Sequence, residues 1–224
     1  MNDIRNRFHQ EWLIPFCERH GYSDAGFVSE SVDKLDPSDA KDFMAAVDDG
    51  LVVHDNGVFR APCSKATEQI FWQGDTKTSP RKISLWIEPI ITMAGLSRLH
   101  RKYGWPMSQL GMQSKTWAFD LVAYSKDKER ELVTCEVKKT WREVEKLISF
   151  MGLHNNSLEE EISSIQGAER NAFKKVIGLR LSRAPIFWAL GPGNESRVFE
   201  VKYGADEEVM LVPSEDKTLA YKCA

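Results

Sequence analysis

Asp120, Glu136 and Lys138 are the residues whose positions most suggest chemistry, because each interrupts an apolar run. Asp120 lies in the run 117–124, and the other two lie in the run 131–138. A cross-strand ion network on an exposed sheet face is the alternative interpretation, worth roughly a few tenths of a kcal/mol per pair. The apolar neighbours on both sides of each charge instead favour polar residues that are retained for a function.

The polar segment between the two runs suits a hairpin turn, so we expect the runs to pair as antiparallel strands. A register that sets Tyr124 opposite Leu132 also sets Asp120 opposite Glu136. Side chains two apart on a strand share a face, so Lys138 projects beside Glu136. The pattern therefore predicts that three ionic groups converge.

Two carboxylates held this close repel each other unless a cation lies between them. Hard oxygen ligands suit Mg²⁺ or Mn²⁺, and Mg²⁺ readily engages phosphate oxygens. A nearby lysine can orient or deprotonate the attacking water and offset the charge that develops on a phosphodiester. These residues favour phosphodiester hydrolysis.

Asp120, fifteen intervening residues and then Glu136-Val137-Lys138, all between apolar runs, resemble the motif of the PD-(D/E)XK nuclease superfamily. The resemblance covers residues 83–212 and implies a restriction-endonuclease-like fold and a DNA substrate. It also implies that Asp120, Glu136 and the backbone carbonyl of Val137 bind the Mg²⁺ or Mn²⁺ ion. Lys138 would serve the attacking water.

A further glutamate from the preceding helix is common in that superfamily. Glu88 is the matching catalytic candidate, with Glu68 behind it, and an ordinary N-cap or surface role is the alternative for Glu88. Phe119 stands where the name of the motif has proline, which is a common variation.

The elements expected from Ile83 onward form an α-β-β-β-α-β core, in which helices flank a central mixed sheet. The residues predict a first helix with buried Ile87 to Leu99 and a Glu88 N-cap. The remaining expected elements are strands at 109–113, 117–124 and 131–138, helices at 141–153 and 169–182, and strands at 185–190, 197–202 and 208–212.

Residues 1–62 are predicted to form three helices and a hairpin, an order that resembles a winged helix. Apolar residues recur every four positions from Ile4 to Phe16, and a short second helix is expected at Phe27 and Val28. Asp36, Pro37 and Gly50 delimit the third helix, and Asn56-Gly57 marks the hairpin turn. The expected organisation is a winged-helix-like domain at 1–62, a linker at 63–82 and a nuclease-like domain at 83–224.

The third expected helix lies in an acidic region, because residues 30–49 hold seven acidic side chains and two lysines. Such a region repels phosphate, so a packing or protein-contact role is favoured over DNA binding through this helix. Basic residues gather instead in the second half, where they could follow a phosphate backbone. The candidates are Lys139, Arg142, Arg170, Lys174 and Lys175, with a solvated helix face as the alternative for each.

The composition is that of a folded globular protein, with 42% hydrophobic and 28% charged residues and a net charge of −3. No apolar stretch is long enough to cross a bilayer, no secretory signal is visible, and the cysteines and histidines lack zinc spacing. We therefore expect a cytoplasmic protein that binds DNA, with RNA as the alternative ligand, and that acts as a homodimer or with a partner subunit. A catalytically inactive nucleic-acid-binding or assembly subunit, or a winged-helix transcriptional regulator, are the alternative functions.

Overall fold

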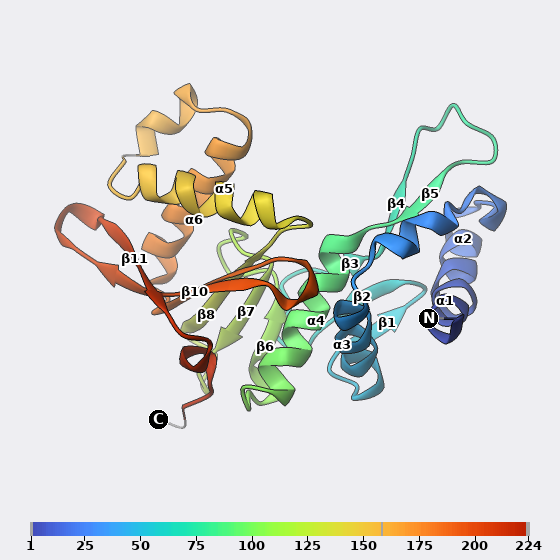
Figure 1. The fold of residues 1–224 in the computed structure, drawn as a ribbon, viewed down its shortest axis with the longest axis horizontal. Helices are drawn as coiled ribbons and strands as arrows, with labels where there is room; N and C mark the ends of the chain where they lie inside the picture. The colour runs from blue at the N-terminus through green and yellow to red at the C-terminus, as the bar shows by residue number, and fades with distance from the viewer. Residues whose placement is uncertain (1, 158, 223–224) are drawn as a thin grey trace.

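The computed structural model describes residues 2–157 and 159–222, which form a mixed α+β fold around a six-stranded sheet (Figure 1). The helices are α1 (Asn2–Arg7), α2 (Ile14–His20), α3 (Pro37–Asp48), α4 (Ile87–Arg101), α5 (Trp141–Leu153) and α6 (Gly167–Ser182). The strands are β1 (Val53–Asp55), β2 (Val58–Arg60), β3 (Glu68–Gln69), β4 (Phe71–Gln73), β5 (Ile83–Leu85), β6 (Leu110–Met112), β7 (Leu121–Tyr124), β8 (Glu131–Val137), β9 (Ile186–Leu190), β10 (Ser196–Tyr203) and β11 (Val209–Ser214).

The six-stranded sheet has the order β11-β10-β9-β8-β7-β6. Strands β8 and β9 are parallel and the other neighbours are antiparallel. The parallel pair needs a long crossover, which α5 and α6 supply. These two helices cover one face of the sheet and α4 covers the other (Figure 1). The expected order of helices and strands from α4 to β9 is therefore confirmed, with both crossover helices placed on one face.

The first helix is continuous through a π-helical stretch, Phe8–Leu13, that joins α1 to α2. A spacing of four residues drifts by about 40° per step on a helix of 3.6 residues per turn. The wider π turn offsets this drift, so that Phe8, Trp12 and Phe16 are all fully buried. Gly21 ends α2 with a φ of 66°, in the left-handed region that glycine enters readily.

The short helix expected at Phe27 and Val28 is wrong. Both residues are extended and lie between two short 3₁₀ turns. Phe27 forms a parallel bridge with Ile83, and the Val28 N–H donates to the Ile83 carbonyl over 2.8 Å. Pairing with a distant segment thus overrides the local helical preference.

The expected boundaries of α3 and of the hairpin are confirmed. The Asp36 side chain accepts a hydrogen bond from the Ser38 N–H, which caps the helix. Asn56 and Gly57 have φ values of 49° and 76°, as the β1–β2 turn requires.

Helix α3 packs against α4, and its carboxylates bind arginines of that helix. Arg98 donates to Asp39 over 2.6 Å and to Asp42 over 2.7 Å, and Arg101 binds Asp49 through both carboxylate oxygens. The acidity of α3 therefore serves packing within the chain. The face of α3 that contacts α4 is not available to a DNA groove.

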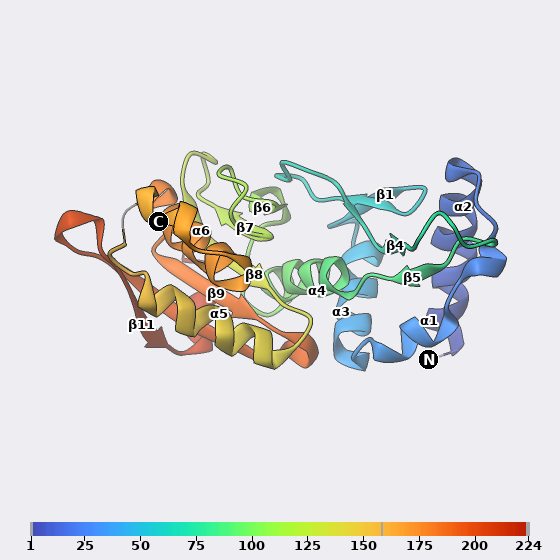
Figure 2. The same ribbon diagram turned by 90° about the horizontal axis from the view of Figure 1, so that it is seen from above.

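The segment 63–82, expected to be a linker, contains two strands. Strand β3 adds to the β1–β2 hairpin, and β4 pairs with β5. One hydrophobic core runs from the N-terminal helices through α4 to the large sheet. Helix α4 lies between the N-terminal helices and the large sheet in Figure 1 and in Figure 2. The first sixty residues therefore share their core with the rest of the chain.

Candidate functional site

The β7–β8 hairpin brings Asp120 and Glu136 to the same end of the sheet. Leu121 pairs with Cys135, and the Asp120 N–H donates to the Cys135 carbonyl over 3.0 Å. This is the expected register. The expected pairing of Tyr124 with Leu132 is wrong, because a bulge sets Tyr124 opposite Glu131.

Asp120 lies immediately before β7. The expected start of this strand at Trp117 is wrong, since the strand begins at Leu121. The preceding residues form a turn, in which Trp117 has a φ of 59°. The Asp120 Oδ2 atom accepts a hydrogen bond from the Val137 N–H over 2.8 Å, which fixes the carboxyl group against the end of β8. Burial, and then the charge of Glu136, raise the pKa of Asp120 to about 8.

Glu136 projects from β8 toward α6, and its side chain is only 4% exposed. Lys138 Nζ lies 2.6 Å from its Oε1 atom, and Lys175 Nζ lies 2.6 Å from its Oε2 atom. Oε2 is in charge contact with Lys175 but accepts no hydrogen bond of good geometry. Two ammonium groups therefore hold one buried carboxylate.

Lys138 projects beside Glu136, as expected from the spacing of two. Its Nζ atom also donates to the Val137 carbonyl over 3.1 Å. Burial opposes the charge of Lys138, but Glu136, Asp120 and Glu88 together raise its pKa above the ordinary value. Lys138 is therefore cationic at neutral pH and can donate a hydrogen bond to a water, but cannot remove a proton from one.

Two pockets open beside these residues and share Glu88 and Lys138 as lining residues. Asp120 lines a pocket of about 150 Å³ between the start of α4 and the end of β8. Glu136 lines the second, of about 330 Å³, which lies between α5 and α6. The two carboxylates thus face neighbouring pockets, with Lys138 at the boundary between them.

Glu88 and Glu68 both line the Asp120 pocket. Glu88 is the second residue of α4, whose N-cap is Trp86, so the expectation that Glu88 caps the helix is wrong. The Trp86 Nε1–H donates to Glu88 over 3.4 Å. Glu68 accepts from Gln113 over 2.9 Å, and burial raises its pKa. Gln113 is a lining residue that the sequence had not indicated.

Lys175 lies against Glu136 and is not on an exposed helix face, so the alternative of a solvated face is wrong for this residue, while its expected contact with nucleic acid stays a prediction. Besides Glu136, its ammonium group binds the Ala118 carbonyl. The spacing along the helix could have indicated that Lys175 faces inward, because it lies three residues after Ala172 and four before Leu179, both of which are fully buried. Residues at those intervals share the face of α6 that packs on the sheet.

The other four basic candidates are exposed. Lys139 precedes α5 and lies 4.0 Å from Glu143 in the first turn of that helix. Arg142, Arg170 and Lys174 form no ion pair with the residues that the structure describes. Lys146 and Asn171, which the sequence had not indicated, line the pocket between α5 and α6.

Over residues 2–157 and 159–222, no three histidine, cysteine, aspartate or glutamate side chains are grouped closely enough to hold a metal ion. In the same part of the chain, no helix combines the length and the apolar character needed to span a bilayer. Comparison with protein-family models, with curated proteins and with solved structures gave no match to this chain.

Proposed function

We propose that this protein is a Mg²⁺- or Mn²⁺-dependent nuclease that hydrolyses DNA phosphodiester bonds on a restriction-endonuclease-like domain. The observation that carries the proposal is the placement of Asp120, Glu136 and Lys138 at one end of the β7–β8 hairpin, beside open pockets. Each ionic group is held by a specific contact at 2.8 Å or less. A buried carboxyl group with a raised pKa, next to a buried carboxylate that is paired with lysine, is more typical of a functional site than of a structural strand.

The donor atoms fit a hard divalent cation. Asp120 and Glu136 supply carboxylates and Val137 a carbonyl, and a cation at Glu136 Oε2 would take the place of the Lys175 ammonium group that lies 2.6 Å from it. The raised pKa of Asp120 also reflects repulsion that a cation would relieve. Two carboxylates suffice for Mg²⁺, which keeps several waters, and Glu88 and Glu68 lie on the same pocket as Asp120.

A bound ion would polarise a phosphate oxygen and favour attack at phosphorus. Lys138, held as a cation by Glu136, would orient the attacking water by donating a hydrogen bond and would offset charge on the phosphate. Lys175 fixes the second oxygen of Glu136 and thereby the direction of that carboxylate. Its role is to position Glu136.

The exposed cations beside the site are suited to the nucleic-acid backbone. Lys139 and Arg142 follow β8 and open α5, and Arg170 and Lys174 lie one turn apart on α6. Arg142, Arg170 and Lys174 lie on the two helices that line the Glu136 pocket, and Lys139 lies just before the first of them. We infer that a strand passes across the mouth of the Glu136 pocket, with RNA as an alternative ligand and a homodimer as one route to cutting both strands.

One observation favours a second candidate, a catalytically inactive nucleic-acid-binding subunit. Both Glu136 oxygens already have a lysine as counter-ion, so this carboxylate does not need a metal to be neutralised. An inactive protein would bind nucleic acid and show no dependence on the ion.

The test uses the full chain with supercoiled plasmid, linear duplex and single-stranded oligonucleotides, in Mg²⁺, in Mn²⁺ and in EDTA. We expect cleavage that requires the ion and that falls about 100-fold or more in Glu136→Gln and in Lys138→Met. Glu145→Gln is the matched control, because Glu145 is an exposed residue of α5 outside both pockets.

Cleavage that survives both site variants, or that continues in EDTA, would overturn the proposal. Retarded migration of DNA without cleavage, together with no calorimetric binding of Mn²⁺, would establish the inactive subunit instead.

A further inference from the structure

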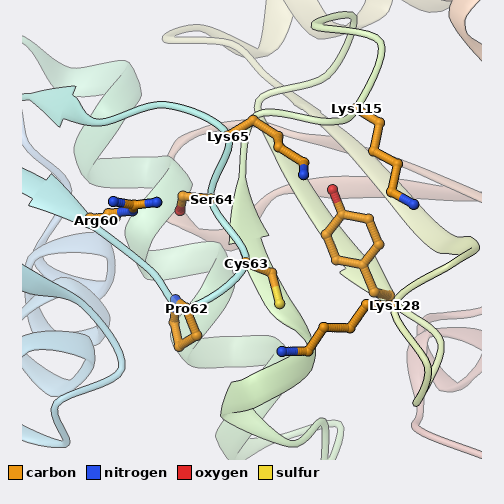
Figure 3. A pocket seen from close by; sticks show the side chains of 8 residues that line it. Arg60, Pro62, Cys63, Ser64, Lys65, Lys115 and Lys128 are labelled. Carbon is orange, nitrogen blue, oxygen red and sulfur yellow. The ribbon is translucent and has the colours of Figure 1, made fainter.

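A separate pocket of about 270 Å³ lies where the β1–β2 hairpin meets the large sheet. Four cationic side chains line it, from three different parts of the chain: Arg60, Lys65, Lys115 and Lys128. Arg60 and Lys65 reach it from one side, and Lys115 and Lys128 from the other (Figure 3). None of its lining residues belongs to the candidate nuclease site.

The wall that carries Lys65 is held in place by its backbone. The N–H groups of Cys63 and Lys65 donate to β6, to the carbonyls of Leu110 and Met112. A Cβ atom on Gly111 would lie 2.5 Å from the Cys63 carbonyl, so only glycine permits this approach. Main-chain contacts therefore fix this wall of the pocket.

The opposite wall comes from the turn before β7 and from the β7–β8 turn. Lys115 Nζ donates to the Glu129 carbonyl over 3.0 Å and lies 5.7 Å from the centre of the Tyr124 ring. The Lys128 N–H donates to the Ser125 carbonyl over 2.8 Å, which closes the turn that presents this lysine.

The positive charge of the pocket is offset in part by one neighbouring acid, the buried Glu131, whose carboxyl group interacts with the charges of Lys115 and Lys65. Within the described residues, none of the four cations forms an ion pair with a carboxylate. The Glu131 Oε1 atom accepts from the Lys115 backbone N–H over 2.7 Å, so this carboxylate binds the main chain of Lys115 and not its ammonium group. The whole chain has a net charge of −3, so the four cations gathered here do not reflect a generally basic protein.

Tyr124 supplies a second, independent indication of a ligand. This residue lines the pocket and is only 2% exposed, yet its hydroxyl group has no hydrogen-bond partner. A buried polar group without a partner costs free energy, and most such groups in native proteins are satisfied by protein, water or a ligand. An oxygen of an anion in the pocket would accept this hydrogen bond.

We propose that the pocket binds a phosphate group, either in a small phosphorylated molecule or in a nucleic-acid strand. A carboxylate carries one charge and two acceptor atoms, too few to engage four cations and a hydroxyl. Phosphate and diphosphate groups carry more charge and several acceptor oxygens. The volume equals that of about nine waters, which is ample for a diphosphate. The proposal goes beyond the nuclease activity and does not depend on it.

The test is calorimetric titration of the full chain with pyrophosphate in EDTA, so that no metal contributes. We expect saturable binding that weakens roughly 100-fold in Lys65→Gln/Lys128→Gln, about tenfold for each charge-assisted contact. Tyr124→Phe should weaken binding severalfold while its melting temperature stays the same or rises, since the change removes an unpartnered buried hydroxyl. Lys77→Gln/Lys82→Gln removes two exposed lysines outside the pocket and should bind as the unchanged protein does.

A second arm titrates a single-stranded oligonucleotide under the same conditions. If the pocket variants bind the oligonucleotide more weakly and the unchanged protein does not bind pyrophosphate, the ligand is a phosphate group of a nucleic-acid strand. Pyrophosphate binding by the unchanged protein would identify a small molecule as the ligand. The proposal would be overturned if the pocket variants bound both probes with the same affinities as the control double variant. Glu136→Gln should retain pyrophosphate binding, so failure of the nuclease proposal and failure of this one are distinguishable.

Discussion

Replacing Lys175 by methionine tests whether the second lysine positions Glu136 or merely lies near it. The Lys175 side chain is 15% exposed and that of Glu136 is 4% exposed, with 2.6 Å between the charged atoms. Methionine keeps much of the side-chain volume and removes the charge. Glu136 then keeps Lys138 on Oε1 and loses its counter-ion on Oε2.

The expected loss of stability in Lys175→Met follows from the burial of the two charged groups and the distance between them. At an effective dielectric constant of 20, two unit charges at this separation attract by about 6 kcal/mol, which is the upper limit. Removing one partner of a buried pair costs roughly 3–5 kcal/mol, because the remaining charge stays buried. Since Lys138 still neutralises Glu136, we expect a loss near the lower end, about 3 kcal/mol of unfolding free energy.

The assay is urea unfolding followed by circular dichroism in EDTA, with Lys174→Met as the control. Lys174 is the adjacent residue of α6, is exposed, and makes no ion pair with a described residue. A loss in Lys175→Met no larger than that in Lys174→Met would refute the reasoning.

The same variant separates a metal site from a purely structural ion network. If Glu136 binds a cation, the Lys175 ammonium group competes with that cation, so Mn²⁺ should raise the melting temperature of Lys175→Met more than that of the unchanged protein. An equal response to Mn²⁺ in both proteins would contradict a ligand role for Glu136.

Two further predictions concern buried carboxyl groups. Because burial and Glu136 raise the pKa of Asp120 from 3.8 to about 8, the folded chain holds this proton more tightly than the unfolded chain and loses stability as pH rises through that window. The melting temperature of Asp120→Asn relative to the unchanged protein, in EDTA, should therefore increase from pH 5 to pH 8, and a constant difference would contradict this. Arg98→Met leaves the fully buried Asp39 carboxylate with the Gly193 N–H as its remaining donor, so it should lower the free energy of unfolding in urea by about 3–5 kcal/mol. The double variant Arg98→Met/Asp39→Asn should recover part of that loss. A loss below about 1 kcal/mol in Arg98→Met would show that this ion pair does not hold α3 to α4.

Elements delimited by local signals were predictable from the sequence. Helix α3 begins at Pro37 after the Asp36 cap, and the β1–β2 turn uses the positive φ of Asn56 and Gly57, because these preferences depend on a few neighbouring residues. The β7–β8 hairpin was equally accessible, since its polar turn and apolar runs specify the pairing of Leu121 with Cys135.

Signals that depend on distant partners were not predictable in this way. The residues around Phe27 in the sequence are compatible with a helix, but Phe27 is extended because its backbone pairs with that of Ile83. The strands in the segment 63–82 are too short to show a period, and they form because β2 and β5 pair with them.

The sequence alone predicted Asp120, Glu136 and Lys138 as the candidate residues, because the strand period of two places Lys138 beside Glu136 and the hairpin register places Asp120 at the same end of the sheet. Only the tertiary structure decided what surrounds them. Packing of α6 on the sheet brings Lys175 to Glu136, and docking of residues 63–65 on β6 helps to assemble the four cations beside Tyr124. The physical reason is that a strand period orders neighbours along one chain segment, whereas contacts between segments depend on how their apolar faces pack.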